Sequence, residues 1–197
     1  RGAGNLLGAE QSGFITDMGF ETYQKILAEA MEELGFETGI SSRSSGDNFV
    51  SDCTIETDQL ALIPDSYIDM TAEKIRIYKE LDSLTSEKDL SNMKNRLTDR
   101  FGKMPVELER LFDIVRIRQL GQKLGFEKII IKNGVMIAFF ITNPLSQYYR
   151  SDRFSKVLEN VNLNPKLFEI KQPDGRLRIM VRNVDGISKA YDILKKL

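Results

Sequence analysis

A short segment at the start of the sequence concentrates residue types that could take part in chemistry. Residues 1–13 hold one arginine, one glutamine and four glycines, namely Arg1, Gln11, Gly2, Gly4, Gly8 and Gly13. Arginine donates hydrogen bonds and glutamine both donates and accepts them, while glycine frees the backbone for close approaches. The segment therefore predicts a moving or contacting part. Because the sequence begins at Arg1 without a methionine, we also expect a piece of a larger protein.

The composition argues against catalysis within this chain. The 197 residues include no histidine and one cysteine, Cys53, so Ser-His and Cys-His nucleophile pairs cannot form and the commonest metal ligand is missing. No G-x-x-x-x-G-K-[ST] phosphate loop occurs, and no pair of carboxylates stands in a distinctive setting. We therefore expect no catalytic residue, no metal site and no cofactor. Cys53 is expected to be a small buried apolar residue.

The cysteine count and the apolar runs also predict the cellular compartment of the protein. A single cysteine excludes an intrachain disulfide and suits a reducing cytoplasm. No apolar run approaches the roughly 20 residues that span a bilayer, so no membrane partner is expected.

Basic residues between positions 86 and 124 offer an alternative function. They are Arg96, Arg100, Lys103, Arg110, Arg116, Arg118 and Lys123. Such clusters bind phosphate backbones. Acidic residues interleave with them and no aromatic stacking platform accompanies them, so a solvated helical surface is the competing interpretation. A nucleic-acid-binding module on these helices stays open.

The first half of the chain is predicted to be mainly helical. Apolar residues recur at helical spacing from Met18 to Leu34, and a polar run over residues 41–50 predicts a flexible linker. A short strand is expected near residues 53–57. Three helices should follow, over residues 72–84, 86–101 and 105–124, the second beginning with a capping box formed by Ser86 and Asp89.

The second half changes to strands. Asn133-Gly134 between apolar runs is a strong hairpin signal, and a helix over 152–161 follows. A second hairpin is expected around residues 173–175, with a closing helix from Gly186, so the two hairpin-plus-helix units could be an internal repeat. The fold class is α+β, with about five short strands in mostly antiparallel hairpins and about five helices. The predicted organisation is a helical appendage over residues 1–40, the linker, and one domain over 51–197.

Four segments carry a family resemblance. Arg1–Gly13 with Gly19-Phe20 resembles the translocation motif shared by two bacterial DNA motors, the transcription-repair coupling factors and the RecG helicases. The segments Leu62–Ile68, Tyr78–Leu81 and Asp99–Gly102 resemble the C-terminal domain of the coupling factors, which RecG lacks. The chain is thus identified as similar to the C-terminal region of that family over nearly its whole length.

The resemblance implies what the whole protein does. Coupling factors are ATPases that move on double-stranded DNA, displace stalled RNA polymerase and recruit excision repair through UvrA. ATP and magnesium would bind in motor domains upstream of Arg1. Arg1 and Gln11 match the family residues that couple ATP hydrolysis to stepping, whereas this chain is expected to be non-catalytic.

The resemblance also implies a regulatory role for residues 51–197. In the family this domain acts as an autoinhibitory clamp that masks the UvrA-binding domain, a shift between closed and open states. Acidic residues on the helix before Arg-Phe-Gly contribute to that contact. Asp99 matches one of them, whereas Arg96 stands where the pattern has another acid, next to Arg100. We therefore expect Asp99, Arg96 and Arg100 at the interdomain contact.

Overall fold

The computed structural model describes residues 49–197. This part of the chain divides into two compact units, which we call the helical unit (residues 60–112) and the sheet unit (residues 49–59 and 113–197). The fold class is α+β, as predicted. The helix predicted over Met18–Leu34 and the linker up to residue 48 lie outside the described residues. No helix within residues 49–197 is long and apolar enough to cross a membrane.

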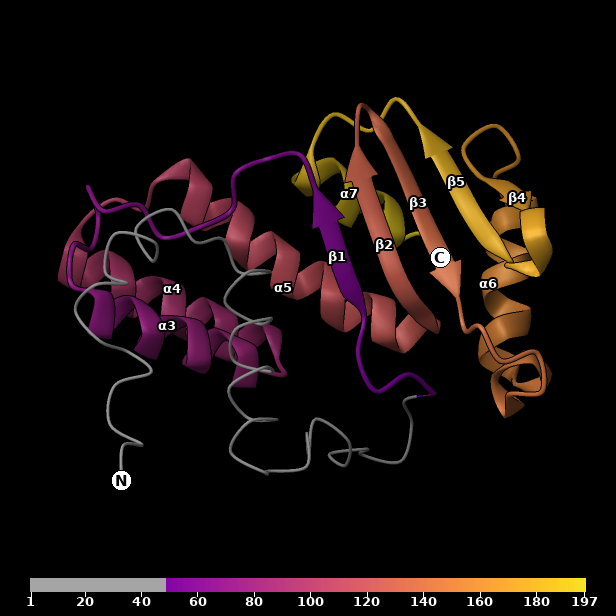
Figure 1. Cartoon of the computed structure of the whole chain (residues 1–197), viewed down its shortest axis with the longest axis horizontal. Coiled ribbons are helices and arrows are strands. Elements are labelled where there is room, and N and C mark those ends of the chain that lie inside the picture. Colours follow the sequence, from indigo (N-terminus) through magenta and orange to yellow (C-terminus); the bar gives the residue numbers. More distant parts are fainter. Residues whose placement is uncertain (1–48) are drawn as a thin grey trace, which may run out of the picture. The chain divides into compact units, whose positions relative to one another are not determined.

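The described residues form five α-helices, five strands and two short 3-10 helices (Figure 1). In chain order they are β1 (Thr54–Thr57), α3 (Thr71–Ser83), α4 (Glu87–Phe101), α5 (Val106–Leu124), β2 (Phe126–Lys132), β3 (Val135–Phe140), η2 (Gln147–Arg150), α6 (Asp152–Leu163), β4 (Glu169–Lys171), η3 (Pro173–Gly175), β5 (Arg178–Arg182) and α7 (Ile187–Leu194). The α-helices and strands thus occur where the sequence predicted them, with ends shifted by up to three residues, whereas η2 was not predicted.

The helical unit contains α3, α4 and the first part of α5. Ser86 caps α4, because its hydroxyl accepts a hydrogen bond from the backbone N–H of Asp89 at 3.1 Å. Gly102 ends the helix at a φ of 85°, where a side chain would be strained. Leu90 and Leu97 lie on the buried face of α4. The predicted capping and stop signals therefore determine where α4 begins and ends.

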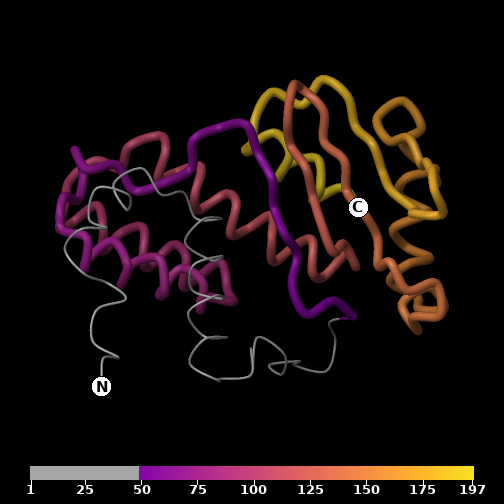
Figure 2. Tube along the Cα trace, in the orientation of Figure 1, coloured from indigo at the N-terminus to yellow at the C-terminus, as the bar shows by residue number. Residues whose placement is uncertain are grey.

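The sheet unit is built on a mixed five-stranded sheet in the order β1-β2-β3-β5-β4 (Figure 2). The strands β1 and β2 are parallel, and every other neighbouring pair is antiparallel. Asn133 and Gly134 turn the β2–β3 hairpin with φ values of 53° and 73°, as a two-residue primed turn requires. The predicted repeat corresponds to two units, β2–β3–α6 and β4–β5–α7, whose inner strands β3 and β5 pair.

One face of the sheet is covered by helices. Ile129, Ala138 and Ile179 are cross-strand neighbours on this face and are all fully buried. Helix α6 packs there through Phe154, whose ring centroid lies 5.5 Å from that of Phe140. In Figure 1, α6 and α7 both lie behind the strands. Residues of the opposite face, which we call the open face, are partly exposed.

The end of α5 is held by a buried tyrosine. The Tyr148 hydroxyl donates to the carbonyl of Leu124, and burial raises the pKa of this tyrosine. Its ring packs edge-on against Phe49 at 5.5 Å and against Phe154 at 5.3 Å. Phe49 and its buried neighbour Val50, the last residues of the predicted linker, thus belong to the folded part.

Candidate interaction site on helices α3 and α4

The loop before α3 is tied to that helix by a buried charge. Pro64 begins the turn, its carbonyl accepting hydrogen bonds from the N–H groups of Tyr67 and Ile68 at 3.0 and 3.1 Å. Asp65 forms an ion pair with Lys74 of α3. The Lys74 side chain is only 4% exposed, whereas that of Asp65 is 43% exposed. A buried lysine must keep a partner, so Asp65 fixes the loop on α3.

Two tyrosine hydroxyls connect the three segments that resemble the C-terminal domain of the coupling factors. The Tyr78 hydroxyl accepts a hydrogen bond from the backbone N–H of Ile63 at 3.0 Å. The Tyr67 hydroxyl lies 3.0 Å from the carbonyl oxygen of Leu97 and 3.1 Å from that of Gly102, so its single proton is shared between two acceptors at the C-terminal end of α4. Burial raises the pKa of both tyrosines, so both hydroxyls stay protonated at neutral pH. The three segments therefore meet in the helical unit.

Arginines of α4 pair with glutamates of α3. Arg96 forms an ion pair with Glu80, and Arg100 pairs with Glu73 at 2.6 Å. Arg76 of α3 also reaches Glu73, at 2.5 Å. Hydrogen bonding from Arg76, together with the charge of Arg100, lowers the pKa of Glu73. The arginine side chains are more than half exposed, so these pairs orient the surface more than they stabilise the fold.

Asp99 lies on the same helix but is not neutralised. It is exposed, and among the residues that the structure describes it forms no ion pair. Arg96 and Arg100, its neighbours on α4, both point their charge toward α3 glutamates. Of the three residues predicted for an interdomain contact, Asp99 thus offers a free charge, whereas the two arginines already have partners.

Sequence reasoning did not single out the α3 glutamates or the Asp65–Lys74 pair. A signal for the former was present, since Glu73 and Glu80 are seven residues apart on one helix and Arg96 and Arg100 are four apart on the next. The pairing itself depends on how α3 and α4 pack. No local spacing indicated that Lys74 would be buried.

The basic residues of the alternative function are largely engaged with acids. In the helical unit, Arg96 pairs with Glu80 and Arg100 with Glu73. In the sheet unit, Arg116 pairs with Asp113 at 3.0 Å and Arg118 with Asp52 at 2.6 Å. These pairs reduce the positive potential that a phosphate backbone would meet. Nucleic-acid binding by helices 86–124 stays a prediction.

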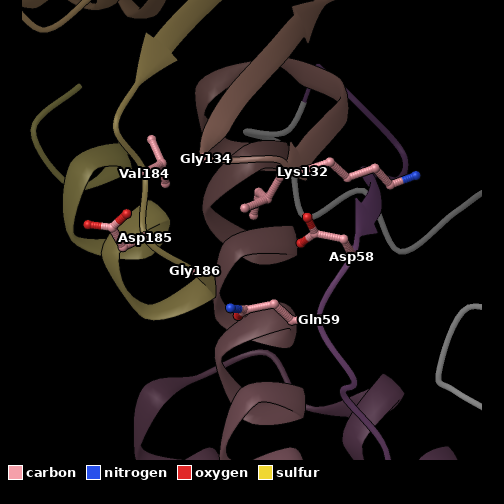
Figure 3. A pocket seen from close by; sticks show the side chains of 8 residues that line it. Asp58, Gln59, Lys132, Gly134, Val184, Asp185 and Gly186 are labelled. Carbon is pink, nitrogen blue, oxygen red and sulfur yellow. The ribbon is translucent and has the colours of Figure 1, made fainter.

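The sheet unit contains a pocket of about 290 Å³ beside α7 (Figure 3). Polar side chains that line this pocket accept hydrogen bonds from neighbouring backbone N–H groups. The Gln59 Oε1 accepts from the N–H of Ile187 at 3.2 Å, and the Asp58 carboxylate accepts from that of Asn133 at 2.8 Å. Residues 49–197 contain no group of three or more Cys, Asp or Glu placed to hold a metal ion. We assign this pocket to the support of the α7 start and the β2–β3 turn.

The residues predicted for the translocation motif cannot be placed. Arg1, Gln11, Gly2, Gly4, Gly8 and Gly13 all lie outside the described residues.

The chain matches one family of proteins by sequence. The family model of the TRCF domain matches residues 57–151. The transcription-repair-coupling factor of Staphylococcus haemolyticus is 40% identical over 197 residues, covering 94% of this chain and 16% of the relative. That of Staphylococcus epidermidis is 36% identical over 184 residues, covering 93% and 14%. That of Escherichia coli is 37% identical over 131 residues, covering 66% and 11%.

The fold matches as well. A crystal structure of the C-terminal domain of transcription-repair coupling factor superposes with a TM-score of 0.60 at 17% identity, covering 74% of this chain and 88% of that one. The chain spans about 14% of the length of the Staphylococcus epidermidis relative. Sequence and fold agree, and this chain belongs to the transcription-repair coupling factor family and carries its TRCF domain.

Proposed function

We propose that this chain is a non-catalytic, regulatory part of a protein that couples transcription to DNA repair. In this proposal the α3–α4 surface of the helical unit binds the UvrA-binding domain of the same protein and masks it until the motor engages RNA polymerase. Membership of the family and the names of the relatives support the link to repair.

The charge of Asp99, which forms no ion pair with any residue in the range 49–197, is the observation that carries the masking proposal. Arg96 and Arg100 are occupied by Glu80 and Glu73, so the surface around them is close to neutral. An exposed carboxylate without a partner keeps its full attraction for a cation on another domain. A basic side chain of the UvrA-binding domain would therefore meet Asp99 first.

Calorimetric titration of the chain with the isolated UvrA-binding domain tests this contact. We expect Asp99→Asn to weaken binding about tenfold, the equivalent of about 1.4 kcal/mol. Asp69→Asn is the matched control, because Asp69 is another exposed carboxylate of the helical unit. Absence of binding by the unmodified chain, or equal losses in both variants, would contradict the contact.

The remaining functions of the family are proposals for the whole protein. Arg1 and Gln11 would couple ATP hydrolysis to stepping on double-stranded DNA, and ATP with magnesium would bind in motor domains outside this chain. UvrA and RNA polymerase would be partners of the complete molecule. ATP hydrolysis by this chain alone would contradict its non-catalytic assignment.

A further inference from the structure

The open face of the sheet carries an apolar ridge along its central strand. Val135, Ile137 and Phe139 alternate along β3 and point to this face, and each is partly exposed. In Figure 1 the strands β2, β3 and β5 run side by side. Phe139 supplies a flat aromatic surface at one end of the ridge.

Cations flank this ridge on both sides. On β2, Lys128 and Lys132 lie opposite Phe139 and Val135, at the two ends of the ridge. On β5, Arg178 and Arg182 lie opposite the same two residues. Neighbouring strands are about 4.8 Å apart, so these two cation rows lie roughly 10 Å apart with the apolar ridge between them.

Among the residues that the structure describes, Arg178 is the cation of this face that has no acidic partner. Its guanidinium carbon lies 5.8 Å from the centre of the Phe139 ring, and its Nε is buried without a hydrogen-bond acceptor. A buried donor left without a partner costs free energy. Arg178 as a whole is partly exposed, so its guanidinium lies beside the aromatic ring where an acceptor from outside the chain can reach it.

Two carboxylates at the outer strands offset only part of this charge. Glu56 of β1 pairs with Lys128 at 2.5 Å and with Lys132 at 3.0 Å. Glu169 of β4 pairs with Arg182 at 3.1 Å and with Lys171 at 3.0 Å. The face keeps a positive excess, since its five cations outnumber these two carboxylates.

We propose that the open face binds a single-stranded nucleic acid, with bases on the β3 ridge and phosphates against the cations of β2 and β5. Single-strand-binding surfaces combine cations that follow the backbone with aromatic rings on which bases stack. The core of a protein–protein interface is depleted of charged side chains, whereas here lysine and arginine directly border the apolar residues. The arrangement thus favours a nucleic acid over an apolar protein surface.

This surface differs from the basic helices considered above. Arg96 and Arg100 of α4 pair with glutamates of α3, whereas Lys94 and Arg116 pair with acids of α5. On the open face the carboxylates occur on the outer strands, and Arg178 lies free beside the only aromatic ring of the ridge. The inference does not depend on the contact proposed for Asp99, which belongs to the other unit.

Fluorescence anisotropy with a labelled twelve-nucleotide oligothymidylate tests the proposal on the full 197-residue chain. We expect binding at about 50 mM salt that weakens as salt rises, with a slope of about −0.7 for each phosphate contacted. Phe139→Leu should weaken binding at least about fivefold, because stacking on an aromatic ring is lost. Phe139→Tyr keeps the ring and should retain binding.

Arg178→Gln should weaken binding several-fold and lower the salt slope by about 0.7, without breaking an ion pair of the described part of the chain. Arg150→Gln is its matched control, since Arg150 is exposed on η2 and outside the sheet. Circular dichroism should show that each variant is folded.

No binding by the unmodified chain, or equal losses of affinity in the Arg178 and Arg150 variants, would overturn the proposal. Equal affinity for a polyglutamate peptide of the same charge would also overturn it and favour an acidic protein partner.

Discussion

Different kinds of contact stabilise the interior of the helical unit and the interior of the sheet unit. In the helical unit, single polar groups connect separate segments, such as the Tyr78 hydroxyl with the Ile63 N–H and Asp65 with Lys74. In the sheet unit, close fit dominates, and a Cβ placed at Gly121 would lie 2.6 Å from the Cys53 sulfur. Substitutions that remove a charge should therefore damage the first unit, and those that add volume should damage the second.

The largest expected effect is in the sheet unit, at the end of α5. Gly125→Ala would place a Cβ 2.2 Å from the Tyr148 ring, at a φ of 82°. The steric clash and the strain of a side chain on a left-handed backbone both destabilise the variant. We therefore expect the free energy of unfolding to fall by about 3 kcal/mol or more. Gly134→Ala is the control, because its φ is 73° but no atom lies within 4 Å of the added Cβ. Urea denaturation measures both, and equal losses would show that packing at Gly125 is unimportant.

A somewhat smaller loss of stability is expected in the helical unit, and it should differ between the two partners of the Asp65–Lys74 ion pair. Asp65→Asn leaves Lys74 buried without a counter-charge, which should lower the free energy of unfolding by about 3 kcal/mol. Lys74→Met fills the same space with apolar atoms and leaves Asp65 43% exposed to water, so its cost should be about 1 kcal/mol or less. Denaturation of the two variants side by side checks this. If Lys74→Met lowered the free energy of unfolding more than Asp65→Asn does, the buried charge of Lys74 would not be what holds the loop against α3.

The smallest effect concerns the open face of the sheet unit. Hydrogen bonds from Lys128 and Lys132 lower the pKa of Glu56. The ion pair therefore contributes above the ordinary pKa of glutamate and is lost as pH falls through the lower pKa of the folded state. Because these groups are partly exposed, the contribution should be about 0.5 kcal/mol or less.

Carbon-13 NMR of the Glu56 carboxylate measures that titration directly. Lys128→Met should raise its midpoint, whereas Lys156→Met, which changes an exposed lysine on α6, should leave it unchanged. A midpoint that does not respond to Lys128 would remove this residue from the open-face charge network.

Local signals in the sequence were sufficient to predict most elements. Ser86 and Gly102 bound α4, and Asn133-Gly134 forms the β2–β3 turn, because caps and turns depend on a few neighbouring residues. The lack of histidine excluded whole classes of catalytic site. The division of the described residues into two units was not indicated, since it falls within the continuous helix α5 between residues 112 and 113.

The sequence by itself determined the fold class, the order of the elements and, through three short segments, the family. Tertiary structure alone decided which charges are free. Arg96 and Asp99 look alike as exposed ions on one helix, yet only packing of α3 against α4 places Glu80 beside Arg96. Likewise, strand register alone brings Arg178 beside Phe139. The physical reason is that charge pairing acts over a few ångströms between residues distant along the chain, which no local pattern encodes.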